Sequence, residues 1–161
     1  MSTACTNFMS IQSPPAYIYQ VVPFEWSTIT TQRNDIRWSQ LDRLLADAKL
    51  RINGAAELET GWGPYEGEKI SREIIVDALN AIESTKKHFL PEYSVPSLIF
   101  AAPGSDGSIG IEFERSNKSL TLVFGPEKSV EVTRGHDNKF EENTTQVRAL
   151  NLEEELRWMA S

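Results

Sequence analysis

Residues 98–124 read LIFAAPGSDGSIGIEFERSNKSLTLVF, and this stretch decides the fold class. Apolar side chains recur at every second position in three short runs, which is the period of a β-strand with one buried face. Segments 103–107 and 115–118 separate the runs and are rich in turn-forming residues. Because such short connections join neighbouring strands, the stretch predicts an antiparallel meander. A turn at 125–128 then leads to a fourth strand, and the predicted apolar face consists of Leu98, Phe100, Ile109, Ile111, Phe113, Leu120, Leu122, Phe124, Val130 and Val132.

Two segments before the meander have the spacing of amphipathic helices. The first begins at Asn34 or Asp35 and ends at a helix stop signal, Asn53-Gly54. The second follows Ser71, a suitable N-cap, and ends before Pro91. Since a sheet with one apolar face needs a cover, both helices are expected to pack on that face. Their apolar stripes are Leu41, Leu44, Leu45, Ala48 and Ile52 in the first, and Ile74, Ile75, Ala78, Leu79, Ile82 and Phe89 in the second.

The two ends of the chain differ from this α+β core, which we place at residues 34–134. Residues 1–33 predict an extended N-terminal arm, whose apolar block 17–22 is either an edge strand or a segment draped over the core. Residues 135–161 predict a polar linker and a short C-terminal helix, since Asn151 and Glu154 have the spacing of a capping box. The expected fold is therefore α+β, with two helices on one face of a four-stranded antiparallel meander.

The charge balance argues against some classes of partner. The 161 residues include 16 Lys and Arg against 23 Asp and Glu, which gives a net charge of -7. Binding to a phosphate backbone rests on clustered cations, so no nucleic-acid partner is expected. No apolar run approaches the roughly 20 residues of a membrane span, so no membrane partner is expected either. The single cysteine, Cys5, cannot form an intramolecular disulfide, which fits a reducing, cytoplasmic location.

The run 62–132 resembles a scattered group of small, uncharacterised bacterial and mobile-element proteins. These proteins combine a tryptophan-glycine loop, a helix rich in Ala and Ile, a proline, and an acidic-faced β-meander with an Asp-Gly turn. The resemblance covers less than half of the chain and implies a fold and a bacterial or phage context, without an activity. The matching pieces are Gly61-Trp62-Gly63, the helix 70–90, Pro96, Asp106-Gly107 and Ile111-Glu112-Phe113.

Signals for catalysis are few. The glycines of loop 61–67 miss the spacing of a dinucleotide-binding loop, and the phosphate-loop and nucleophile-elbow motifs are absent, so no cofactor is expected. Glu112 and Glu114 lie two residues apart on one predicted strand and make a candidate acid/base pair. The alternative function is thus a small hydrolase or metal-dependent enzyme, with the candidate residues Glu112, Glu114, Glu131 and His136.

The leading hypothesis is a non-enzymatic adaptor or inhibitor that binds another protein. It rests on the missing catalytic motifs, the acidic charge and the aromatic residues outside the core pattern. Trp62 either fills a gap between helices and sheet or serves as an exposed recognition anchor. A second copy of the chain is a further candidate partner, because the N-terminal arm can exchange between the subunits of a homodimer. The candidate contact residues are Tyr17, Tyr19, Trp26, Trp62 and Tyr65.

Overall fold

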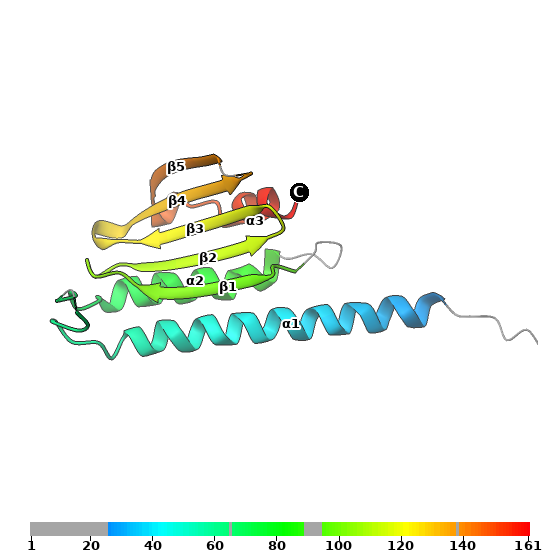
Figure 1. The fold of residues 1–161 in the computed structure, drawn as a ribbon, viewed down its shortest axis with the longest axis horizontal. Coiled ribbons are helices and arrows are strands. Elements are labelled where there is room, and N and C mark those ends of the chain that lie inside the picture. The colour runs from blue at the N-terminus through cyan, green and yellow to red at the C-terminus, as the bar shows by residue number, and fades with distance from the viewer. Residues whose placement is uncertain (1–25, 65, 89–94, 138) are drawn as a thin grey trace, which may run out of the picture.

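The computed structural model describes residues 26–64, 66–88, 95–137 and 139–161. Its architecture is α+β, with three described helices packed against one antiparallel sheet (Figure 1). The helices are α1 (Trp26–Ala55), α2 (Arg72–His88) and α3 (Leu152–Ala160). The strands are β1 (Leu98–Pro103), β2 (Ile109–Arg115), β3 (Lys118–Phe124), β4 (Ser129–His136) and β5 (Lys139–Gln146).

The sheet is a five-stranded meander in the order β1-β2-β3-β4-β5, with each strand antiparallel to the next. The meander is confirmed, but the predicted four strands are one too few. β5 forms within the segment that the sequence predicts as a polar linker. Its sequence, KFEENTTQ, lacks alternating apolar residues, and none of its side chains is buried. Edge strands that pair through the backbone on one side need no hydrophobic pattern, which explains the missed strand.

β1 turns the opposite face toward the core from the one predicted. Ile99 is 3% exposed, whereas Phe100 is 36% exposed. Backbone pairing places Ile99 beside the buried Phe113 and Phe100 beside Glu112. The run 98–102 is apolar throughout, so its pattern does not reveal which face is buried. Pairing with β2 decides the face, because a shift of one residue exchanges the two faces of a strand.

α1 begins at Trp26 rather than at Asn34 or Asp35. No proline lies between Pro23 and Pro64, so the sequence contains no strong helix breaker over this length. Residues 26–33, predicted as part of an extended arm, therefore belong to a helix. The apolar block 17–22 lies outside the described residues, as do Phe89 and Pro91 at the predicted end of α2.

Both shorter helices begin where their capping residues predict. The backbone N–H of Ile74 donates to Ser71 Oγ at 3.3 Å at the start of α2. At the start of α3, the backbone N–H of Glu154 donates to Asn151 Oδ1 at 3.3 Å. Asn151 Nδ2 in turn donates to Glu154 Oε2 at 3.2 Å. The bonds from the backbone N–H groups of Ile74 and Glu154 satisfy donors that a helix leaves free in its first turn.

The helices cover the sheet differently from the prediction. α2 and α3 lie against one face and contact β2 and β3, whereas α1 contacts β1 and α2 (Figure 1). No described helix packs against the other side of the sheet, which we call the uncovered face. The core lies between the helices and the first face, and its largest fully buried side chains are Phe113, Phe124, Leu41, Ile52, Ile82, Ile109, Ile111, Leu120, Leu122, Leu156 and Met159.

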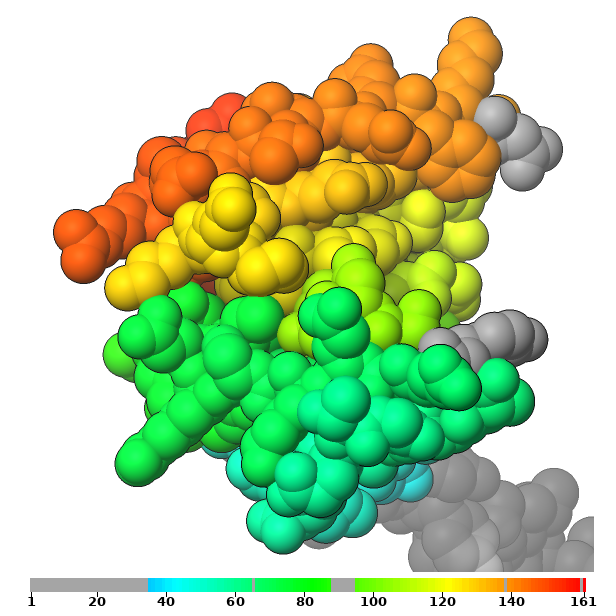
Figure 2. All heavy atoms as spheres, turned by 90° about the vertical axis from the view of Figure 1, so that its left-hand side faces the viewer, coloured from blue at the N-terminus to red at the C-terminus, as the bar shows by residue number. Residues whose placement is uncertain are grey.

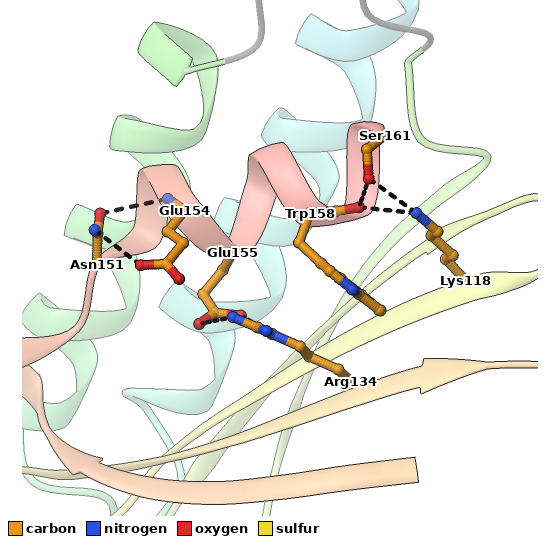
Figure 3. A network of polar contacts seen from close by, with 7 residues as sticks. All are labelled: Lys118, Arg134, Asn151, Glu154, Glu155, Trp158 and Ser161. Carbon is orange, nitrogen blue, oxygen red and sulfur yellow. Dashed lines mark hydrogen bonds and ion pairs between the residues drawn. The ribbon is translucent and has the colours of Figure 1, made fainter. Parts of the chain in front are cut away.

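Polar contacts with the sheet fix the position of α3 (Figure 3). Arg134 on β4 makes a two-pronged ion pair with Glu155, from Nε to Oε2 at 2.8 Å and from Nη2 to Oε1 at 2.9 Å. Lys118 Nζ donates to the carbonyl oxygen of Trp158 at 3.0 Å, which places a cation at the negative end of the helix dipole. Both cations also lie near the Trp158 ring, with Lys118 Nζ at 5.2 Å and Arg134 Cζ at 5.5 Å from its centroid.

Candidate functional site

The glycine-rich loop 61–67 closes on itself around Trp62. Gly61 N donates to Gly67 O at 2.8 Å and Gly67 N donates to Trp62 O at 3.0 Å, which forms a small antiparallel bridge. The indole Nε1 donates to the carbonyl oxygen of Glu68 at 3.0 Å. The indole lies against Gly67, where a Cβ atom would overlap Cε2 and Nε1 of Trp62. Trp62 thus stabilises its own loop and does not belong to the core cluster.

Of the other aromatic candidates, only Trp26 lies within the described residues. Trp26 is the first residue of α1. Tyr17, Tyr19 and Tyr65 lie outside the described residues. Among the predicted contact residues, Trp62 is the one whose side-chain contacts are described, and those contacts lie within its own loop.

The three candidate glutamates lie on the uncovered face. Glu112 and Glu114 belong to β2 and Glu131 belongs to β4, so β3 separates the pair from the third carboxylate. His136 lies five positions after Glu131 on the same strand. An odd separation places the two side chains on opposite faces, about 17 Å apart along the strand. The structure therefore does not bring His136 to the glutamates.

His136 instead belongs to a polar cluster between two hairpin turns. Its Nε2 lies 3.1 Å from Asn117 Nδ2 and 3.3 Å from Asp137 Oδ2. Asn117 Nδ2 also donates to Asp137 Oδ1 at 2.7 Å. Within the described ranges, no group of three or more His, Cys, Asp and Glu side chains is placed to hold a metal ion. The cluster joins the turn before β3 to the turn after β4. Its contacts hold these two turns together, which is a structural role.

Small side chains occupy the middle of the uncovered face. Ser119, Thr121 and Val123 point outward from β3, because the alternate residues Leu120, Leu122 and Phe124 are buried. We call these three outward residues the β3 strip. On β4, Thr133 pairs with Thr121 and extends the strip of small residues by one strand.

Four glutamates border the β3 strip. Glu112 pairs directly with Thr121 across β2 and β3, and Glu142 on β5 pairs with Thr133. Glu114 pairs with Ser119 and Glu131 pairs with Val123, so each lies two residues further along the strands than the Glu112–Thr121 pair, in opposite directions. The strip therefore has two carboxylates on the β2 side and two on the side of β4 and β5. We call Glu112, Glu114, Glu131 and Glu142 the flanking glutamates.

Two phenylalanines lie at the outer strands of the same face. Phe100 on β1 is 36% exposed, and the guanidinium of Arg51 from α1 lies 4.7 Å from its ring centroid. Phe140 on β5 is 66% exposed and lies across Gly135, where a Cβ atom would be 3.0 Å from Phe140 Cε1. Glycine at 135 thus makes room for the ring. Aromatic side chains exposed beside polar groups are typical of protein contact surfaces.

Phe140 and Glu142 are not predicted as surface contacts from the sequence, because the pattern of residues 139–146 does not predict β5. The signal that favours a strand there is the adjacent pair of β-branched residues, Thr144 and Thr145. The outward direction of Phe100 is not predicted either, because β1 is apolar on both faces.

A separate hollow lies at the N-terminal end of α2, below β5 and the following segment in Figure 2. It has a volume of about 590 Å³. Lys128 Nζ, at its rim, pairs with Glu73 Oε2 at 3.4 Å. The hollow is lined by Arg72, Glu73, Val76, Asp77, Lys128, Val147 and Arg148, a mixture of both charges that does not favour one class of ligand.

Comparison with protein-family models, curated proteins and solved structures gives no match to this chain. The resemblance of the run 62–132, with the bacterial or phage context that it implies, therefore stays a prediction, and so does the cytoplasmic location. Over the described residues, every helix is too short or too polar to span a membrane.

Proposed function

We propose that this protein is a non-enzymatic adaptor or inhibitor that binds another protein through the uncovered face. The observation that carries the proposal is that four carboxylates and two exposed phenylalanines lie together on one face, against which no described helix packs. Exposed strands carry charges routinely, and these charges also prevent aggregation. Two phenylalanines on the same face do not serve that purpose, and they favour contact with a partner.

Catalysis has less support. A general acid and a general base must both reach one substrate, but Glu131 and His136 lie on opposite faces and β3 separates Glu112 from Glu131. The described hollows are lined by other residues. Glu112 and Glu114 do share one face of β2, but they line none of the described hollows, so no site for a substrate adjoins them.

Affinity capture from the native host tests the proposal. The full chain is used as bait beside two variants, Thr121→Arg on the β3 strip and Asn80→Arg on the exposed surface of α2. We expect the unchanged chain and Asn80→Arg to retain one stoichiometric protein, and Thr121→Arg to lose it. Recovery of no stoichiometric protein would refute the binding function, while equal recovery with Thr121→Arg would exclude the uncovered face as the contact surface.

A further inference from the structure

We infer that the partner presents a positively charged α-helix to the uncovered face, with its axis along the β3 strip. This inference rests on the proposed function and adds the chemistry of the partner. Charge, spacing and backbone pairing each contribute a separate argument.

Charge comes first. The carboxylates of the flanking glutamates make no ion pair or hydrogen bond with any described residue. Other glutamates of this chain do have cationic partners: Glu59 pairs with Lys69 at 2.9 Å and Glu83 with Lys49 at 3.2 Å. Arg51 reaches the face only at its border, over Phe100. A partner with Lys or Arg would therefore meet four unpaired carboxylates, and electrostatic complementarity of this kind favours both encounter rate and specificity.

The spacing of the carboxylates fits the width of a helix. Neighbouring strands lie about 4.8 Å apart, so β2, with Glu112 and Glu114, is about 10 Å from β4, with Glu131, and about 14 Å from β5, with Glu142. An α-helix with its side chains is about 10–12 Å across. From Ser119 to Val123 the strip is about 14 Å long, which corresponds to about nine helical residues. Small or apolar residues of the helix would contact the strip, and cations on its two flanks would reach Glu112 and Glu114 on one side and Glu131 and Glu142 on the other.

Backbone pairing argues against an extended segment. The backbones of β2, β3 and β4 pair with a neighbouring strand on both sides, so a segment lying on this face gains side-chain contacts alone. Strand addition would use the outer edge of β5 instead, where backbone groups face away from β4. A second copy of this chain is disfavoured on the uncovered face because each copy has a net charge of -7.

Fluorescence anisotropy with designed peptides tests the inference. The probe is a labelled, end-capped peptide of about 14 residues, long enough to cover the strip as a helix, with an Ala/Leu stripe flanked by lysines. A second peptide has the same charge and two central prolines, which break the helix. The face variant is Glu112→Gln/Glu114→Gln/Glu131→Gln/Glu142→Gln. Its matched control removes four exposed carboxylates elsewhere: Asp47→Asn/Glu57→Gln/Glu66→Gln/Glu127→Gln.

We expect the helical peptide to bind the unchanged chain and the control, with at least a tenfold weaker affinity for the face variant. The proline peptide should bind at least tenfold more weakly than the helical one. Equal affinity for face variant and control, or for the two peptides, would overturn the inference. Circular dichroism melts of both variants show that each is folded. If affinity capture yields a partner that Thr121→Arg loses while the peptides fail, the helix inference falls and the proposed function stands; if capture fails, the proposed function falls.

Discussion

Arg134 and Glu155 join the sheet to α3 through two parallel hydrogen bonds of 2.8 and 2.9 Å. Their side chains are 27% and 12% exposed, so the pair is screened less than a surface ion pair. The hydrogen bond from Arg134 to Glu155 raises the pKa of Arg134 above its ordinary value. Arg134 is thus charged at every pH at which the protein would be studied.

Replacing Glu155 tests this connection. Glu155→Gln removes the charge and one of the two acceptors, so we expect the free energy of unfolding to fall by about 1–3 kcal/mol. The exposed carboxylate of Glu57 provides a control, since Glu57→Gln should change stability by less than about 0.5 kcal/mol. Urea unfolding followed by circular dichroism gives both values. Equal losses in the two variants would show that the pair contributes nothing beyond a surface charge.

Gly67 makes room for the Trp62 indole, so an added methyl group should be costly there. We expect Gly67→Ala to lower the free energy of unfolding by about 1–3 kcal/mol, because the Cβ atom overlaps the indole. Gly54→Ala is the matched control. Gly54 lies in α1 with open space around its Cα, and alanine is the better helix former, so this change should be neutral or stabilising by up to about 1 kcal/mol. A neutral Gly67→Ala would mean that the indole is not held in the loop.

Asp106 predicts a pH dependence of stability. The Ser108 hydroxyl donates to Asp106 Oδ1 at 2.6 Å, and this hydrogen bond lowers the pKa of Asp106 below its ordinary value of 3.8. Since the folded-state pKa is the lower one, the contribution is complete above the unfolded-state pKa and is lost as the pH falls through the folded-state pKa. Asp106→Asn and Ser108→Ala should each reduce the stability difference between pH 6 and the acid range, as measured by urea unfolding. Asp47→Asn, on the exposed side of α1, should not; an unchanged profile in Asp106→Asn would contradict the prediction.

Phe113 lies on the buried face of the sheet, so replacing it tests whether this face forms the core. Its side chain is 0% exposed, beside Ile99 on β1 and Leu120 on β3. We expect Phe113→Ala to lower the free energy of unfolding by about 3–5 kcal/mol, as for other large-to-small changes in a core. A loss below about 1 kcal/mol would mean that this sheet face is not the core.

The oligomeric state stays a prediction. From the sequence we expect a homodimer with the N-terminal arm or an edge strand in the interface, and removal of the arm tests the version in which the arm holds the dimer. Light scattering on the full chain should then give twice the chain mass of 18.1 kDa, and a chain that begins at Trp26 should give the monomer mass. A monomeric full chain at high micromolar concentration, or a dimer that persists without the arm, would contradict the version in which the arm holds the dimer.

The sequence by itself predicts the strands and helix starts whose patterns involve residues only a few positions apart. The alternation in β2, β3 and β4, the Ser71 cap of α2 and the Asn151 cap of α3 all predict structure correctly, because side chains two, three or four positions apart share a face or a hydrogen bond.

Tertiary structure decided the features that depend on a distant neighbour. β5 exists because β4 offers its free edge, and pairing with β2 selects the buried face of β1, although neither sequence reveals the partner. Trp62 binds its own loop rather than the core, because Gly67 leaves space for the indole. The uncovered face also depends on elements that are distant in the sequence. Alternation within each strand shows that polar residues share one side, but the packing of α2 and α3 against the opposite side decides that no described helix covers it.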